Sequence, residues 1–169
     1  VVEPTQAQSR RVFKQIESCI PAAIKSANST LLTMEFINGS ELIFKSAEQR
    51  EALRGFTVNG LLVIDEAAFI SSDIINILYP LCDANNAPIL FISTPLFQSG
   101  EFYNLYVKGN EGNPNIRSFN WSKYDTSKYL SAEKLAFYKA TVSPLKFQSE
   151  YLGEFIAEGS YIFGDIFQC

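Results

Sequence analysis

The chain has 169 residues, of which 47% are hydrophobic and 19% are charged, a composition that fits one globular domain and argues against disorder. Because it contains no histidine, it excludes catalysis by Ser-His or Cys-His pairs and any histidine-based metal site. With a net charge of −4, any contact with nucleic acid must be local or supplied elsewhere, and the longest apolar runs are too short for a membrane span.

The N-terminal segment predicts a short strand followed by a helix. Residues 1–3 resemble the end of a strand. Thr5 and Gln8 then match a capping box, in which the hydroxyl and the amide close the first helical turn reciprocally. Apolar residues recur at helical spacing through residues 6–19, so we expect a helix there with a buried stripe.

Further elements are predicted in the rest of the chain. Apolar or alternating runs predict strands over residues 31–36, 41–44, 61–65, 89–93 and 116–120, and helical spacing predicts helices over residues 100–107, 131–139 and 144–152. Asn38-Gly39 joins the first two strands as a hairpin. A helix that starts near Ser71 and ends or bends at Pro80 connects the strand at 61–65 to the strand at 89–93. Strand, helix and strand in this order predict a parallel pair whose carboxyl ends lie on one edge of a sheet.

Two adjacent carboxylates, Asp65 and Glu66, directly follow an apolar strand. Charges are costly to bury, so we expect the pair at the carboxyl end of that strand, where open α/β sheets bind ligands. Nucleoside triphosphatases place one carboxylate there near Mg²⁺ and the next near an attacking water. Asp65 would then hold Mg²⁺ through a coordinated water, and Glu66 would orient and deprotonate the water that attacks the γ-phosphate. The alternative is a hydrated loop that carries two carboxylates.

Two other sets of residues are candidates for contact with a nucleotide. Ser93 and Thr94 stand where the next parallel strand ends, and their hydroxyls can bond a γ-phosphate or the attacking water. An ordinary strand-to-loop turn is the alternative. Arg54 lies in the connection that leads into the Asp65 strand, where a guanidinium can neutralise transition-state charge in its own subunit or a neighbouring one. The alternative is a surface arginine beside a turn.

A glycine loop that holds phosphates and continues into lysine and Ser/Thr has no counterpart here. None of the nine glycines is followed by lysine. We therefore expect the chain to start downstream of such a loop. We also expect this chain alone to hydrolyse ATP poorly, because the lysine and amides that hold the β- and γ-phosphates would be missing.

Together, these motifs resemble the ATPase domain of the large terminase subunit of tailed bacteriophages, the motor and nuclease that cuts and packages genomic DNA. The matching segments are residues 2–8, 44–47, 53–55, 62–70, 92–95, 100–103 and 148–155. Residues 62–70 resemble the Walker B motif of the family, and residues 92–95 resemble its coupling motif. The resemblance implies an α/β fold of the P-loop NTPase type, with a mainly parallel twisted sheet, helices on both faces and the N-terminal Walker A part missing.

The resemblance also implies a role for each candidate residue, with ATP and Mg²⁺ as the cofactors. Asp65 corresponds to the Mg²⁺-associated carboxylate and Glu66 to the catalytic glutamate. Ser93 and Thr94 fall in the segment that couples hydrolysis to DNA movement. Arg54 falls where an arginine acting on a neighbouring subunit has been proposed in this family.

The partners and the domain boundaries follow from the same resemblance. It implies double-stranded DNA, the small terminase subunit and the portal protein of the procapsid as partners, in a homo-oligomeric ring in the cytoplasm of the bacterial host. Residues 1–155 would form a partial ATPase domain, and residues 156–169 a linker toward a nuclease domain. A nucleic-acid helicase and a non-catalytic α/β interaction module are the alternatives, although a module has no need of two adjacent carboxylates.

Overall fold

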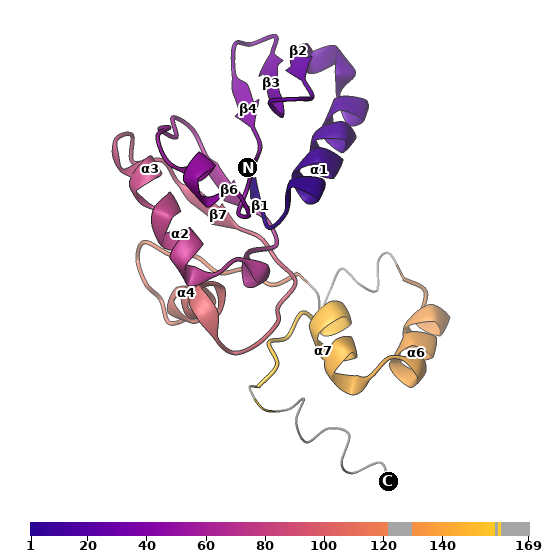
Figure 1. Ribbon diagram of the computed structural model, residues 1–169. Coiled ribbons are helices and arrows are strands. Elements are labelled where there is room, and N and C mark those ends of the chain that lie inside the picture. Colours follow the sequence, from indigo (N-terminus) through magenta and orange to yellow (C-terminus); the bar gives the residue numbers. More distant parts are fainter. Residues whose placement is uncertain (122–129, 158, 160–169) are drawn as a thin grey trace. The chain divides into compact units, whose positions relative to one another are not determined.

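The structure is a computed structural model that describes residues 1–121, 130–157 and 159 (Figure 1). The chain divides into two compact units, Val1–Ser93 and Thr94–Cys169. Every named strand of the described residues lies in the first unit, whereas the second unit is built from helices. Among the described residues, none of the helices combines the length and the apolar character needed to cross a bilayer.

A parallel sheet of four short strands, in the order β5-β1-β6-β7, forms one part of the first unit. The strands are β1 (Val2–Glu3), β5 (Lys45–Ser46), β6 (Leu62–Ile64) and β7 (Ile89–Phe91). Strand β6 pairs in parallel with β7, with Leu62 opposite Ile89 and Ile64 opposite Phe91. This sheet confirms the predicted α/β fold and the predicted parallel pair.

The connection from β6 to β7 also follows the prediction closely. It consists of η3 (Ala67–Phe69), α2 (Ser72–Leu78) and α3 (Pro80–Asp83). Proline cannot donate the backbone hydrogen bond that a continuous helix needs, which explains the break at Pro80. Ser71 occupies the predicted N-cap position of α2, but its side chain makes no capping hydrogen bond.

An antiparallel sheet, in the order β2-β3-β4, forms the other part of the first unit. Its strands are β2 (Ile24–Asn28), β3 (Thr33–Phe36) and β4 (Glu41–Ile43). The predicted hairpin is confirmed as β3 and β4, and Gly39 has the positive φ of 82° that the turn requires. The sequence did not predict β2, which is polar and largely exposed.

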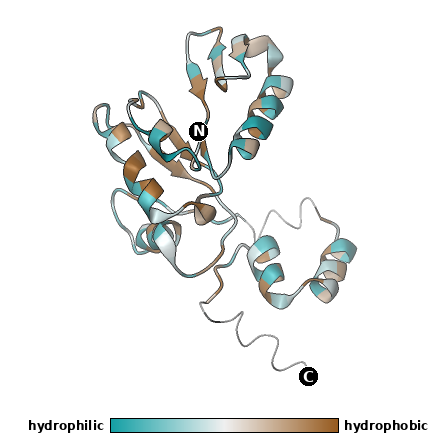
Figure 2. Ribbon diagram, in the orientation of Figure 1, coloured by the Kyte–Doolittle hydropathy of each residue, from teal (hydrophilic) through white to brown (hydrophobic). Residues whose placement is uncertain are grey.

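Helix α1 (Gln6–Cys19) supplies the apolar stripe that buries one face of the antiparallel sheet. The predicted capping box is present, because Thr5 accepts from the backbone of Gln8 and the Gln8 side chain accepts from the backbone of Thr5. The hydrophobic cluster between α1 and the antiparallel sheet consists of Phe13, Leu32, Met34 and Phe44. Figure 2 shows hydrophilic residues along much of α1 and hydrophobic residues in α2, β6 and β7. Two single-turn helices, η1 (Pro21–Ala23) and η2 (Arg50–Leu53), complete the unit.

Three helices form the described part of the second unit: α4 (Gly100–Asn110), α6 (Ala132–Thr141) and α7 (Pro144–Leu152). The predicted helices are confirmed, with α4 three residues longer than expected. The strand predicted over residues 116–120 is wrong, because the structure has no strand in that segment. Instead, the Ser118 hydroxyl donates to the Tyr106 carbonyl at 2.8 Å and the Asn120 amide donates to the Gly153 carbonyl at 2.7 Å. Of the segment predicted as a linker, residues 158 and 160–169 lie outside the described residues.

Candidate active site

Asp65 and Glu66 stand at the carboxyl end of β6, the position that the sequence predicts. Strand β6 is held on both sides, because the Asp65 N–H donates to the Val2 carbonyl and the Ile92 N–H donates to the Ile64 carbonyl, both at 2.9 Å. Ile64 is fully buried, whereas both carboxylate residues are half-buried. The pair is therefore partly accessible at the carboxyl end of a strand, the place where open α/β sheets bind ligands.

Glu66 adopts a left-handed backbone conformation, with φ 49° and ψ 42°. This conformation costs a non-glycine residue roughly 1–2 kcal/mol, so the surrounding structure must hold it in place. Three hydrogen bonds do so: Glu66 N–H to Asp65 Oδ1 at 3.0 Å, Phe69 N–H to the Glu66 carbonyl at 2.9 Å, and Ala67 N–H to the Ile92 carbonyl at 3.0 Å. The turn directs the chain sharply away from the strand at this residue.

Ser93 lies just beyond β7 and contacts Glu66 directly. Its hydroxyl donates to Glu66 Oε2 at 3.4 Å and accepts from the Ala68 N–H at 3.2 Å. The first distance is long for a hydroxyl donor, so the bond is weak in this conformation. The structure therefore brings Ser93 and Glu66 together across two neighbouring strand ends. Thr94, the other predicted hydroxyl, begins the second compact unit and is half-buried.

Arg54 ends η2 and has an exposed guanidinium. Its Nε lies 3.9 Å from Glu51 Oε2, and both side chains are largely exposed. Such a pair is screened by solvent and contributes little to stability. Within the described part of the chain, the ion pair of Arg54 is with its own segment rather than with Asp65 or Glu66.

A third carboxyl, that of Glu3, belongs to this cluster and was missed by the sequence analysis. Glu3 is only 1% exposed, and its Oε1 has no hydrogen-bond partner among the described residues. Its pKa is raised from 4.5 to about 7, chiefly by burial and then by the charge of Asp65 and a hydrogen bond with the Asp65 side chain. Glu66 adds to the rise in this pKa, and Arg11 opposes it. A glutamate within the strand end predicted at residues 1–3 was the signal that could have revealed it.

These carboxylates fit a magnesium ion that is shared with a phosphate ligand. Among the residues that the structure describes, no three His, Cys, Asp or Glu side chains are grouped so that they could hold a metal ion by themselves. Mg²⁺ commonly takes one or two protein carboxylates and completes its octahedron with waters and substrate phosphates. Asp65, with Glu66 beside it, provides that kind of donor set.

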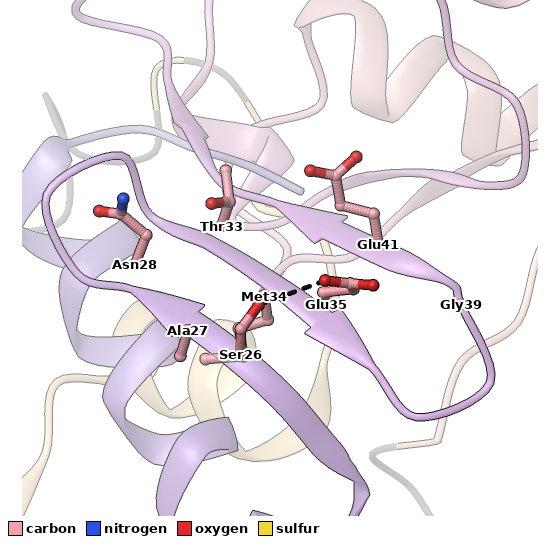
Figure 3. A pocket seen from close by; sticks show the side chains of 8 residues that line it. All are labelled: Ser26, Ala27, Asn28, Thr33, Met34, Glu35, Gly39 and Glu41. Atoms are coloured by element: carbon pink, nitrogen blue, oxygen red, sulfur yellow. Dashed lines mark hydrogen bonds between the residues drawn. The ribbon is translucent and has the colours of Figure 1, made fainter.

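A shallow pocket of about 560 Å³ lies on the antiparallel sheet (Figure 3). It is lined by Ser26, Ala27, Asn28, Thr33, Met34, Glu35, Gly39 and Glu41. Figure 3 shows the Ser26 hydroxyl bonded to Glu35, which is also paired with Lys25. None of the predicted site residues lines this pocket, so the candidate active site is the carboxyl edge of the parallel sheet.

The chain matches the family described as terminase large subunit, T4likevirus-type, N-terminal, over residues 4–165. A comparison with curated protein sequences finds no match. Among solved structures, the ATPase domain of the large terminase of Thermus phage P74-26 is similar, with a TM-score of 0.76 and 22% sequence identity. That similarity covers 92% of this chain and 75% of the phage domain.

The large terminase of a thermophilic bacteriophage is similar in two ligand states. In complex with ADP it has a TM-score of 0.73 and 18% identity, over 92% of this chain and 39% of that protein. In complex with ATP-γ-S it has a TM-score of 0.67 and 19% identity, over 92% of this chain and 38% of that protein. The chain thus spans less than half of that large terminase, and at these identities the likeness shows a shared fold. Because the family match covers nearly the whole chain, this chain belongs to the family of phage large terminase subunits, in their N-terminal ATPase region.

Proposed function

We propose that this chain provides the hydrolytic carboxylates of a phage DNA-packaging motor, which couples Mg²⁺-dependent ATP hydrolysis to movement of double-stranded DNA into procapsids. The observation that supports this most is the joining of Asp65, Glu66 and Ser93 at the carboxyl ends of β6 and β7. Membership of the terminase family favours this function over a helicase or a non-catalytic module. The ADP and ATP-γ-S in solved relatives support a nucleotide as the ligand.

In this proposal each carboxylate has a separate task. Asp65 would hold Mg²⁺, through a coordinated water, and its Oδ1 accepts from the Glu66 N–H. When bound, the ion would neutralise phosphate charge and help to orient the γ-phosphate. Glu66 orients the attacking water and takes its proton, and the Ser93 hydroxyl holds the Glu66 carboxylate during this step.

Thr94 and Arg54 have roles that depend on the nucleotide and on neighbouring subunits. We assign Thr94 to contact with the nucleotide, as the residue that follows Ser93 in the chain. We assign Arg54 to charge neutralisation in a neighbouring subunit of the ring, since its exposed guanidinium is accessible from outside the fold.

The wider assembly is part of the same proposal. The partners would be double-stranded DNA, the small terminase subunit and the portal protein, with copies of the protein forming a ring in the host cytoplasm. Residues 1–155 would belong to the ATPase domain, and residues 156–169 would lead to a nuclease domain. With a net charge of −4, this chain is expected to leave most phosphate contacts with DNA to other parts of the motor.

The test is ATP turnover by the whole protein carrying Glu66→Gln. Removing a general base costs typically 10²–10⁴-fold in rate, so we expect phosphate release to fall by at least about 100-fold. Binding of a fluorescent ATP analogue should change little, because glutamine keeps the size of the side chain. Glu35→Gln, on the antiparallel sheet, is the matched control and should turn over ATP at the wild-type rate. Turnover by Glu66→Gln at the wild-type rate would remove the role given to Glu66.

A further inference from the structure

Glu3 is the most deeply buried acidic residue that the structure describes, and the roles assigned above do not use it. Only 1% of it is exposed, and Oε1 has no hydrogen-bond partner among the described residues. A buried polar atom without a hydrogen-bond partner typically costs about 1–3 kcal/mol of stability. An apolar residue in this central strand would avoid that cost, so burial alone does not account for a glutamate here.

The strand register places Glu3 beside Asp65. Val2 on β1 is the pairing partner of Ile64 on β6, and the Asp65 N–H donates to the Val2 carbonyl at 2.9 Å. Because side chains alternate along strands, the residues that follow this pair, Glu3 and Asp65, share the opposite face of the sheet. After burial, Asp65 contributes most to the raised pKa of Glu3, through its charge and a side-chain hydrogen bond.

This contact fixes Asp65 from one side while the backbone fixes it from the other. Asp65 Oδ1 accepts from the Glu66 N–H at 3.0 Å. The Glu3 carboxyl is the second group that interacts with the Asp65 side chain. A hydrogen bond between two carboxyl groups holds one hydrogen between them. Two such points of attachment restrict an aspartate side chain before a ligand binds, so less entropy is lost on binding.

We propose that Glu3 is a positioning residue, which acts through its hydrogen bond with Asp65 to orient that carboxylate for the divalent cation. This inference rests on the function proposed above, in which Asp65 holds Mg²⁺. Metal-binding carboxylates are commonly held by hydrogen bonds from neighbouring groups, and loss of such a neighbour typically lowers metal affinity about 10–100-fold. Glu3 supplies that support from β1, the strand adjacent to the one that carries Asp65.

The experiment measures the affinity of the whole protein for Mn²⁺, used in place of Mg²⁺, in the presence of ADP. Electron paramagnetic resonance measures the concentration of unbound Mn²⁺. Glu3→Leu removes the hydrogen bond and should weaken Mn²⁺ binding by about 10–100-fold. Glu3→Gln keeps an N–H that can donate to Asp65, so its affinity should stay within about threefold of wild type. Asp65→Asn is the positive control and should also weaken binding.

Folding of the variants is checked by thermal unfolding with EDTA present. Leucine replaces a buried carboxyl, so Glu3→Leu should unfold at a temperature no lower than wild type. Where that variant fails to fold, Glu3→Ala provides the second removal of the carboxyl. Equal loss of Mn²⁺ affinity in the glutamine and leucine variants would overturn the inference, since it would make Glu3 a direct ligand of the ion. Unchanged affinity in the leucine variant would also overturn it. If Asp65→Asn kept the wild-type affinity, the magnesium role of Asp65 would be wrong as well, an outcome distinct from the other two.

Discussion

The two sheets of the first unit each carry a glutamate that accepts from a serine hydroxyl at the same distance. On the parallel sheet, Ser93 donates to Glu66 Oε2 at 3.4 Å, and on the antiparallel sheet Ser26 donates to Glu35 Oε2 at 3.4 Å. The surroundings of the two pairs differ. Glu66 is strained in its backbone and lies beside Asp65, whereas Glu35 is in a regular strand and is paired with Lys25. A side-chain contact alone therefore does not mark a site, and the neighbouring charges and backbone do.

The acidic residues of the two sheets also respond in opposite ways to their surroundings. Burial and the neighbouring carboxylates raise the pKa of Glu3 to about 7. A hydrogen bond from Lys25 lowers the pKa of the exposed Glu35. The parallel sheet thus gathers like charges at its carboxyl edge at a cost in stability, while the antiparallel sheet neutralises its charges. Such costly arrangements of charge are typical of functional sites in proteins.

The largest effect expected from this difference is on the pH dependence of folding. The folded-state pKa of Glu3, about 7, is above the ordinary value of 4.5, so the folded state keeps a proton that the unfolded state releases. Its contribution is complete below pH 4.5 and is lost as the pH rises to about 7. We expect the free energy of unfolding to fall by on the order of 3 kcal/mol across this window. Urea unfolding with EDTA present, at several pH values, measures it.

Glu3→Gln cannot release this proton and should lack that fall in stability. Glu35→Gln is the matched control from the other sheet. Because the pKa of Glu35 is lowered, its contribution is present above its ordinary pKa and is lost only as the pH falls through the lower value. The control should therefore keep the wild-type slope between pH 4.5 and 7. A wild-type slope in Glu3→Gln would show that Glu3 is not the group responsible.

The same contrast explains which features the sequence could predict. The strand that ends at Asp65, the break at Pro80 and the Thr5 capping box each depend on local chemistry, and each is confirmed. Strand β5 and the exposed strand β2 have no such pattern, because they are defined by pairing with distant segments. Glu3 was missed for the same reason: its proximity to Asp65 exists only once β1 lies beside β6. The roles of Asp65, Glu66, Ser93, Thr94 and Arg54 remain predictions.

A smaller effect is expected from the serine of each pair. In the whole protein, Ser93→Ala removes the hydroxyl that holds Glu66 and should lower ATP turnover by about tenfold, the equivalent of about 1.4 kcal/mol. Binding of a fluorescent ATP analogue should be nearly unchanged, since Ser93 acts through Glu66. Ser26→Ala, which removes a hydroxyl at the same distance from Glu35, should turn over ATP at the wild-type rate. Equal losses in the two variants would show that the contact with Glu66 has no special role.

The smallest effect is expected from the ion pair that neutralises the antiparallel sheet. Lys25 and Glu35 are both solvent-exposed, so water and salt screen their attraction and the two long side chains lose rotamer freedom when paired. Lys25→Met should therefore leave the urea midpoint of unfolding unchanged within error, both at low and at high salt. A clear loss of stability that disappears at high salt would mean that charge neutralisation supports this sheet. The two sheets would then differ in the sign of their electrostatic interactions. Attraction would stabilise the pairing of β2 with β3, whereas repulsion is concentrated beside Asp65 and Glu66.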